Sequence, residues 1–356
     1  MKKVKFTDVF EDVTKQGRKI STDGYKREGK YPIIDQGQNE IAGYTNEEYG
    51  LFNNVPAIIF GDHTRIIKFV NTPFFLGADG VKVLKHIIPN VDYKYSYYAL
   101  LNVKIPDTGY NRHFKWLKES EIPLPSLEEQ KAIAEKLDKV SELIEKRKTQ
   151  LEKLDLLIKS RFIEMFGDIT KEDMLINLCH FIDYRGKTPE KVESGLPFIT
   201  AKNVKMHNMS FDTQEYISKE TYDKVMTRGF PKIGDVLFTT EAPLGNVCRI
   251  PHIDTEFYIG QRIITMQTDC LEPAYLEYAL SSDTFREKIA EKSSGSTVIG
   301  IRSKLLEQLT IPVPPRKLQT QFATFVEQVD KSKFEIQKSL EKLEILKKFL
   351  MQQYFG

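Results

Sequence analysis

The feature that most constrains this chain is a long segment that occurs twice. Residues 122–167 align without a gap with residues 311–356 at a constant offset of 189, and fourteen aligned positions are identical. The identities include an Ile-Pro-x-Pro entry, a glutamine five residues after the second proline, and a terminal Phe-Gly. A match of this length indicates an internal duplication, so the fold has to be built from two copies of one plan.

Each copy predicts one long helix. The two prolines at its start exclude helix and hold an extended entry. In the first copy Ser126 lies three residues before Glu129, which is the spacing of a capping box, and Gly167 stands where a left-handed residue is expected to end the helix. About forty residues of helix make a rod of about 60 Å.

The apolar residues of both copies recur at alternating spacings of three and four, which is the period of a coiled-coil seam. Basic residues interrupt the seam at Arg147, Arg161, Lys333 and Lys347, which costs stability but can set the register. We expect the helices to pair antiparallel within the chain; two ordinary core helices, or a coiled coil between two chains, are the alternatives. The seam consists of Leu137, Val140, Ile144, Leu151, Leu154, Ile158 and Met165, and of Phe322, Val326, Val329, Ile336, Leu340, Leu343, Leu350 and Tyr354.

Composition bounds the class of protein. The 356 residues are 40% hydrophobic and carry a net charge of +2, so the chain can form two cores and is not a basic nucleic-acid coat. Residues 127–166 hold nine basic and nine acidic side chains, which is typical of an ion-paired solvated helix. The three cysteines form no CxxC pair, and no run approaches membrane-spanning length. These features predict a cytoplasmic protein without disulfides, a zinc site or a membrane segment.

The two segments before the helices share one order of elements. Strand-like runs bounded by turn residues are followed by a helical pattern in both segments. The predicted strands are 55–61, 64–70 and 80–85 before a helix at 92–102, and 196–204, 234–240 and 261–267 before a helix at 272–292.

Short echoes support this duplication of the globular parts. Tyr31-Pro32-Ile33-Ile34 corresponds to Leu196-Pro197-Phe198-Ile199, Ile59-Phe60 to Leu237-Phe238, and Tyr98-Ala99-Leu100 to Tyr278-Ala279-Leu280. The expected fold class is α+β, with two globular domains alternating with two long helices and related by pseudo-two-fold symmetry. The expected boundaries are 1–121, 122–167, 168–310 and 311–356.

With these motifs the chain resembles the specificity subunit of type I restriction–modification systems, in which two target-recognition domains alternate with two repeat helices. The likeness covers essentially the whole chain. In the first domain FGDHTRIIKFV and LGADGVKVL replace the phrases of the second, which indicates a second subtype of recognition domain. The matching stretches are IPLPSLEEQKAIAEKLD with IPVPPRKLQTQFATFVEQVD, the FG endings, GDVLFTTEAPLGNVCRI, GQRIITMQ and SGSTVIGIRSKLLEQLTIPVPP.

The resemblance implies a non-catalytic subunit that binds double-stranded DNA, reads a split site with one half per domain, and uses its helices as a spacer. It implies two modification subunits that methylate adenine with S-adenosylmethionine, and restriction subunits that use ATP and Mg. No cofactor is expected in this chain, which lacks a Gly-x-Gly methyltransferase loop, an Asn-Pro-Pro-aromatic motif and a GxxxxGK[ST] loop. The alternative is a coiled-coil adaptor whose domains bind proteins and have no DNA specificity.

Base reading requires amide and guanidinium side chains on loops, with lysines for phosphates. Asp107, Glu129 and Lys131 imitate the spacing of a metal-dependent nuclease, but Glu129 is better explained as a helix cap. The six histidines occur singly, so no metal site is expected. The candidate DNA-binding residues are Gln36, Gln38, His63, Thr64, Arg65, Asn111, Arg112 and His113 in the first domain, and Arg185, Lys187, Lys202, Asn203, Gln261, Arg262, Ser296, Thr297 and Arg302 in the second.

Overall fold

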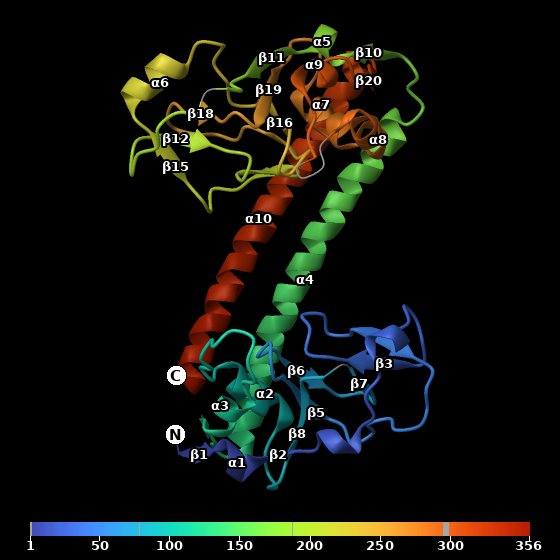
Figure 1. Ribbon diagram of the computed structural model, residues 1–356, viewed down its shortest axis with the longest axis vertical. Coiled ribbons are helices and arrows are strands. Elements are labelled where there is room, and N and C mark those ends of the chain that lie inside the picture. The colour runs from blue at the N-terminus through green and yellow to red at the C-terminus, as the bar shows by residue number, and fades with distance from the viewer. Residues whose placement is uncertain (1, 78, 187, 295–298) are drawn as a thin grey trace. The chain divides into compact units, whose positions relative to one another are not determined.

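The computed structural model describes residues 2–77, 79–186, 188–294 and 299–356. They form two compact units, one of residues up to 149 together with 337–356, and the other of residues 150–336. The long helices α4 (Leu127–Phe166) and α10 (Arg316–Phe355) each contribute one half to each unit. Helices and sheets are mixed in both units (Figure 1), which confirms the α+β class.

The first unit contains a four-stranded antiparallel sheet of order β2-β8-β5-β6 and a three-stranded sheet of order β4-β3-β7. In the smaller sheet β3 pairs antiparallel with β4 and parallel with β7, and at the entry to α4 β1 pairs with β9. The elements are β1 Lys3–Lys5, α1 Phe6–Val9, β2 Phe10–Asp12, the 3-10 turns Thr14–Gln16 and Thr22–Gly24, β3 Tyr31–Ile34, β4 Gly43–Thr45, β5 Ala57–Gly61, β6 Ile67–Val70, β7 Phe75–Leu76, β8 Val81–His86, α2 Tyr93–Leu101, α3 Phe114–Lys118 and β9 Glu121–Pro123.

The second unit repeats this topology. Its sheets have the orders β11-β19-β16-β17 and β15-β12-β18, with the same parallel and antiparallel pairings, and β10 pairs with β20 at the entry to α10. The hairpin β13–β14 and the helices α6 and α8 are additions. The elements are β10 Glu172–Met174, α5 Leu175–Leu178, β11 His180–Asp183, β12 Leu196–Ile199, β13 Val204–Lys205, β14 Asn208–Met209, β15 Glu215–Ile217, α6 Lys219–Val225, β16 Val236–Thr239, β17 Val247–Arg249, β18 Tyr258–Ile259, β19 Ile263–Gln267, α7 Pro273–Ser281, α8 Asp283–Lys292, α9 Ser303–Leu306 and β20 Thr310–Pro312.

The sequence echoes occupy equivalent elements. The Tyr-Pro-Ile-Ile stretch forms β3 and its counterpart forms β12, each the central strand of its three-stranded sheet. Phe60 of β5 pairs with the second residue of β8, and Phe238 of β16 pairs with the second residue of β19, so the two phenylalanines lie at the same register. The duplication inferred from the sequence is therefore confirmed at the level of strand pairing.

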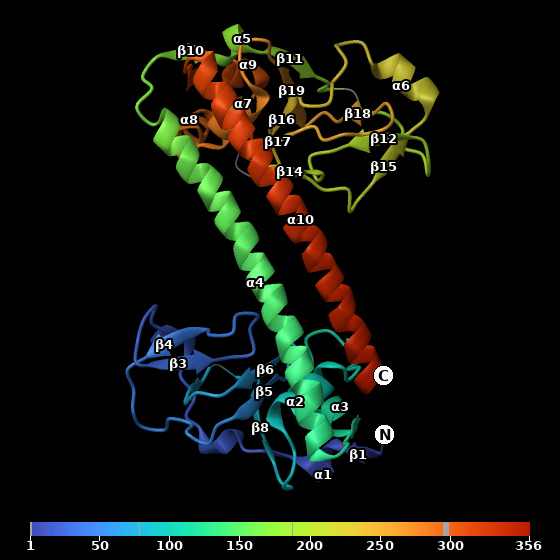
Figure 2. The same ribbon diagram turned by 180° about the vertical axis from the view of Figure 1, so that it is seen from behind.

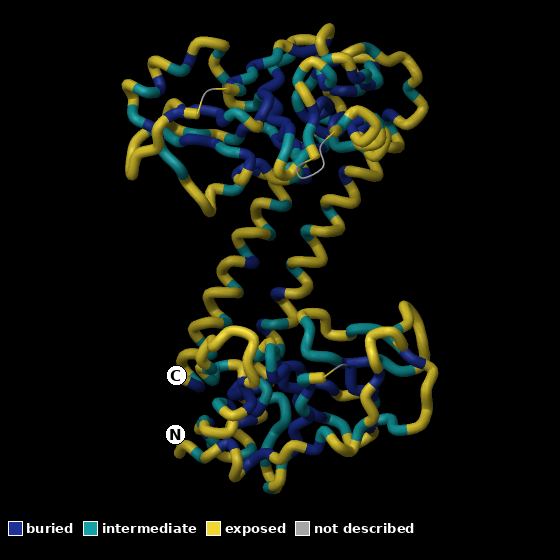
Figure 3. The backbone as a smooth tube through the Cα atoms, viewed as in Figure 1, coloured by how far each residue is buried: buried dark blue, intermediate teal, exposed yellow. Residues whose placement is uncertain are grey.

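The two long helices pack antiparallel within each unit. In the first unit the beginning of α4, at Leu137, shares a core with the end of α10, at Phe355. In the second unit the end of α4 meets the beginning of α10, because the rings of Phe162 and Phe322 are 5.5 Å apart. Figure 3 shows that the helices are exposed over much of their length, while the predicted seam residues are buried or half-buried. Arg161 is exposed and pairs with Glu164, so its assignment to the seam was wrong.

The helix ends confirm one prediction and correct two. The Ser126 amide donates to the Glu129 carboxylate at 3.0 Å and the Glu129 amide donates to the Ser126 hydroxyl oxygen at 3.4 Å, as a capping box requires. Gly167 is not left-handed: its amide still donates to the Ile163 carbonyl at 2.8 Å, so the right-handed turn continues. The helix expected at 272–292 is broken at Ser282, whose extended backbone and hydroxyl cap α8.

The strand ends also differ from the prediction where turns intervene. The run 64–70 becomes strand only from Ile67, because Arg65 is left-handed with φ 62° and closes the turn after β5. The run 196–204 is divided between β12 and β13 by a turn that the buried side chain of Asn203 holds.

The identical glutamines of the repeat have one structural role in both units. The Gln130 side-chain oxygen accepts from the Asp92 amide at 2.9 Å, and its nitrogen donates to the Pro125 carbonyl at 2.9 Å. Gln319 makes the same bonds to the Glu272 amide, at 2.9 Å, and to a proline carbonyl, at 2.8 Å. Both glutamines are 1% exposed, so each long helix begins with a buried amide that joins it to the start of α2 in the first unit or of α7 in the second.

Candidate nucleic-acid interface

The shared topology brings the predicted loops of each unit together. In both units one predicted loop follows the central strand of the small sheet and another precedes the short helix α3 or α9. In the first unit the amide of Asp62, directly after β5, donates to the Gly80 carbonyl at 2.7 Å, and the His113 amide donates to the Asp62 carbonyl at 2.7 Å. In the second unit the Thr240 amide donates to the Arg262 carbonyl at 2.9 Å, and the Ile301 amide donates to the Thr240 carbonyl at 3.0 Å.

Gln36 ties two loops of the first unit to each other. Its side-chain nitrogen donates to the Asp79 carbonyl at 2.9 Å, and its side-chain oxygen accepts from the His63 amide at 3.1 Å. The Thr64 hydroxyl donates to the Gln36 carbonyl at 2.6 Å. Gln36 and Thr64 therefore shape the loop, whereas Gln38 is exposed.

The turn after β5 meets the loop before α3. The Arg65 guanidinium pairs with Asp107 at 2.7 Å, and the His63 ring stacks on Tyr110 with centroids 4.7 Å apart. Bonds from the Gly109 amide and from Arg65 hold the pKa of Asp107 below its usual value. This loop also carries the exposed Asn111 and Arg112, whereas His113 is 1% exposed and its Nδ1 lies 3.0 Å from the Asp62 carbonyl oxygen.

Three predicted residues of the second unit line one cavity of about 220 Å³, and these are Lys202, Gln261 and Arg262. The Arg262 Nε lies 2.8 Å from the Glu241 carboxylate. Lys202 is exposed, and none of the ion pairs found among the described residues involves it. The cavity therefore combines a held arginine, an amide and an unpaired lysine at the ends of strands.

The remaining candidates of the second unit differ in how exposed they are. Arg302 is exposed at the start of α9, two residues after Gly300, whose backbone bridges to Glu241. Arg185 folds back on Asp183 at 3.0 Å. Asn203 is 3% exposed and bonds through both side-chain polar atoms to backbone, so its amide is turned inward. Lys187, Ser296 and Thr297 lie outside the described residues.

Sequence reasoning missed the acidic partners of the arginines and one aromatic residue. Asp107 and Glu241 were not among the candidates, because acidic loop residues carry no sign of a distant ion pair. Tyr110 is 86% exposed beside His63. Its neighbours Asn111 and Arg112 were chosen, so the same loop signal could have included it.

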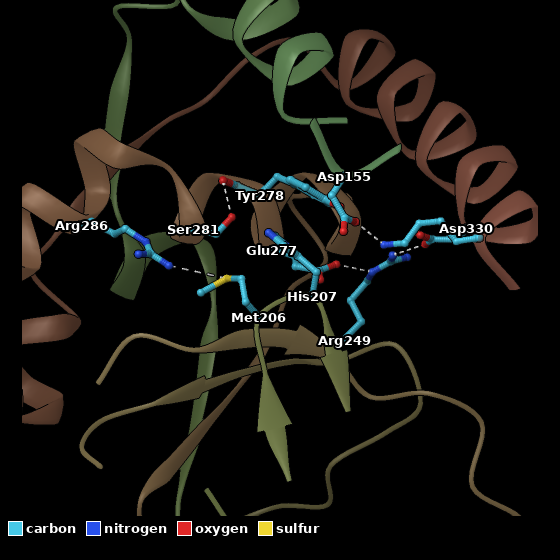
Figure 4. Close-up of polar contacts among 10 residues, drawn as sticks. Asp155, Met206, His207, Arg249, Glu277, Tyr278, Ser281, Arg286 and Asp330 are labelled. Atoms are coloured by element: carbon cyan, nitrogen blue, oxygen red, sulfur yellow. Dashed lines mark hydrogen bonds and ion pairs between the residues drawn. The ribbon is translucent and has the colours of Figure 1, made fainter. Parts of the chain in front are cut away.

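A buried charge network anchors the second unit to α10 (Figure 4). The Glu277 side chain, 2% exposed on α7, accepts from Arg249 Nε at 2.6 Å and lies 3.0 Å from His207 Nδ1. Arg249 continues to Asp330 of α10 at 2.9 Å (Figure 2 shows β17 beside α10). Burial alone would raise the pKa of Glu277, but His207 and Arg249 outweigh it and hold the pKa below its usual value.

The network continues from α10 to α4 and to the hairpin β13–β14. Lys333, which follows Asp330 by three residues on α10, pairs with Asp155 of α4 at 2.5 Å. His207, in the hairpin turn, is left-handed with φ 57°, and its ring stacks on Tyr278 with centroids 4.1 Å apart. Among the strands that the structure describes, the first unit has no equivalent of the hairpin β13–β14 that carries His207.

Among the described residues, no group of three or more His, Cys, Asp or Glu side chains could hold a metal ion. None of their helices combines the length and the apolar character that crossing a membrane would need. The nuclease-like triplet is dispersed: Asp107 binds Arg65 and Glu129 caps α4.

Two solved structures share this fold. The type I restriction–modification S subunit from M. genitalium matches with a TM-score of 0.64 at 19% identity, over 100% of this chain and 96% of that one. A chain from a structure on complex assembly and conformational transition of the type I R-M system matches with a TM-score of 0.53 at 19% identity, over 99% of this chain and 97% of that one.

Sequence comparison gives the same family. The specificity subunit of restriction enzyme MjaVIII of Methanocaldococcus jannaschii is 24% identical, over 91% of this chain and 85% of its own length. The EcoR124I/EcoR124II specificity subunit of Escherichia coli is 24% identical, over 84% of this chain and 79% of its own length. The model of the type I restriction modification DNA specificity domain matches residues 1–154 and 177–347. The chain, with two units of one topology and two long helices, therefore belongs to the type I restriction–modification DNA specificity family.

Proposed function

We propose that this chain is the DNA-recognition subunit of a type I restriction–modification complex and reads a split site. Residues 1–121 and 168–310 are the two recognition domains, each reading one half. The observation that carries the proposal is the repetition of one topology with different side chains on equivalent loops: Gln38 after β3 corresponds to Lys202 after β12, and the loop with Arg112 before α3 corresponds to the one with Arg302 before α9. Equivalent frames with different reading groups suit two different half-sites.

The subunit has no catalytic role in this proposal. It holds two modification subunits, which methylate adenine with S-adenosylmethionine, and it recruits restriction subunits that use ATP and Mg. A coiled-coil adaptor without DNA specificity is not favoured, because the family model covers most of the chain.

The test is selection of duplex DNA by the chain assembled with its partner methyltransferase. From a randomised pool we expect enrichment of one split sequence, with affinity falling steeply as salt rises because phosphate contacts release counterions. Enrichment of no sequence, or selection that persists when this chain is omitted, would refute the proposal. Exchange of residues 168–310 for another recognition domain is the matched control, and it should change one half-site only.

Arg262 and Lys202 are expected to behave differently on replacement by alanine. Arg262 is held in place by an acidic partner, so we expect Arg262→Ala to cost about 1–3 kcal/mol and to relax preference at one base pair. Lys202 lacks such a partner, so Lys202→Ala should weaken binding to all sequences alike and reduce the slope of affinity against salt by about one. For Arg302, a second exposed candidate, we expect Arg302→Ala to give the same loss and the same relaxed preference at one base pair in this binding assay. A uniform loss for Arg262→Ala would assign that residue to phosphate.

Lengthening both long helices should change the spacer between the half-sites. One heptad inserted after Leu151 and one after Leu340 preserve the seam and add roughly 10 Å at about 1.5 Å per residue. On DNA that rises about 3.4 Å per base pair, this is roughly three base pairs. Selection experiments should return unchanged half-sites with a longer spacer, or weaker binding where the groove phase no longer matches. Full affinity for the original spacer would show that the helices do not set it.

A further inference from the structure

Arg262 is held by one edge of its guanidinium. Its Nε lies 2.8 Å from the Glu241 Oε1, and Arg262 lines the cavity with Lys202, Gln261 and Ala242, the residue that follows Glu241. A guanidinium has its donors in a rigid planar fork, so a carboxylate at Nε restricts the direction in which the terminal nitrogens point. Bidentate recognition of guanine uses two such donors on O6 and N7.

Glu241 is itself fixed by the backbone. It forms an antiparallel bridge with Gly300, and the Thr240 amide directly before it donates to the Arg262 carbonyl at 2.9 Å. Glu241 is therefore joined through the backbone both to the turn before β19, which carries Arg262, and to the segment that leads to Arg302. Its negative charge also opposes the approach of a phosphate to this point.

The first unit contains a second instance of an arginine held across two loops. Arg65, which is left-handed, pairs with Asp107 at 2.7 Å, and the two residues come from the turn after β5 and from the loop before α3. The arrangement differs in detail, because the terminal nitrogen Nη2 of Arg65 makes this contact. In both units an acidic side chain from a neighbouring loop holds an arginine that sequence reasoning selected for base reading.

We propose that Glu241 is a specificity-determining positioning residue of the second recognition domain. It orients Arg262 toward guanine, and its negative charge disfavours a contact between Arg262 and a DNA phosphate. It therefore lowers the affinity for other sequences more than the affinity for the recognised sequence. Asp107 has the corresponding role for Arg65. This inference rests on the proposed DNA-reading function and assigns a part in it to side chains that do not resemble DNA ligands.

A purely structural role does not account for the pair. The Arg262 and Glu241 side chains are 54% and 39% exposed, and exposed ion pairs contribute little to stability. The same unit offers a matched control in Lys219 and Glu256, which pair at 2.6 Å, are each 53% exposed, and do not line the cavity.

The experiment compares the wild type, Glu241→Gln, Glu241→Asp and Glu256→Gln, each assembled with the partner methyltransferase. Affinities for the selected split duplex and for an unrelated duplex are measured over a range of salt, together with the melting temperature. For Glu241→Gln we expect the ratio of specific to unrelated affinity to fall by roughly tenfold or more, in keeping with the discrimination of one bidentate contact. Binding to the unrelated duplex should tighten, and its salt slope should steepen by about one as Arg262 takes a phosphate.

Glu241→Asp should keep part of the discrimination, and Glu256→Gln should leave the ratio and both salt slopes unchanged. The Arg262→Ala variant separates positioning from direct reading, because Glu241→Gln should have no further effect on the ratio in that background. A changed base preference in that background would mean that Glu241 reads a base itself, and it would overturn the positioning role. An unchanged ratio for Glu241→Gln alone would overturn it too, while leaving the DNA-reading function intact. A wild-type complex that selects no sequence would overturn both.

Discussion

Replacement of Glu277 by alanine should lower the free energy of unfolding of the second unit by about 3–5 kcal/mol, the usual cost of removing one partner from a buried ion pair. Glu277 is 2% exposed, and both of its carboxylate oxygens are used, one by Arg249 and one by His207. Without it, the guanidinium of Arg249 loses its buried partner and keeps the partly exposed Asp330. The loss should appear as a shift of the denaturant midpoint followed by circular dichroism.

The chain offers a control and an internal reporter for this measurement. Glu327→Ala removes an exposed ion pair with Lys331 from α10, and it should change stability by less than about 1 kcal/mol. Trp116 is the sole tryptophan of the chain and lies in the first unit, so its fluorescence follows that unit. A Glu277→Ala shift no larger than that of Glu327→Ala would contradict the expectation.

The contribution of Glu277 should depend on pH in one direction. The folded pKa lies below the ordinary glutamate value, so the unfolded chain binds the proton first as pH falls. The stabilisation is therefore fully present above the unfolded pKa of about 4.3 and is lost as pH falls through the folded value. The difference in stability between the wild type and Glu277→Gln should shrink as pH falls below about 4.3. A difference that grows with acid would contradict this sign.

Phe355→Ala should destabilise the first unit by about 3–5 kcal/mol, as expected for a buried aromatic ring replaced by alanine. Phe355 is 6% exposed, its ring lies 5.3 Å from that of Tyr95, and its carbonyl accepts from Asn102 at 2.9 Å. The transition of Trp116 fluorescence should move to lower denaturant concentration. The aligned residue is Phe166, whose ring centroid lies 4.8 Å from that of Tyr275. Phe166→Ala should lower the stability of the second unit by a similar amount.

The matched control for Phe355→Ala is Phe349→Ala on the same helix, because Phe349 is 62% exposed. Its removal should change stability by less than about 0.5 kcal/mol in the isolated chain. If Phe166→Ala moved the fluorescence of Trp116 as far as Phe355→Ala does, the assignment of each ring to its own unit would be wrong.

The sequence alone determined the duplication, the two long helices and the order of strands. These signals are local: prolines exclude helix before Leu127 and Arg316, Ser126 and Glu129 form the cap, and the apolar period extends through both copies. A local signal acts through neighbours along the chain, so it survives in any context. The broad β-rich runs were identified for the same reason.

Tertiary structure decided which polar side chains are available and what holds them. Lys202 and Asn203 are adjacent in sequence, yet one is exposed and the other is bonded inside a turn. The partner of Arg262 comes from a different loop, and Glu277 lies in a predicted helix whose pattern gives no sign of a buried charge. Burial and ion pairing depend on residues that are distant in sequence, and the energy of a charge depends on the solvent that the fold removes. Only the folded chain therefore separates the candidates that remain at the surface from those that became part of its interior.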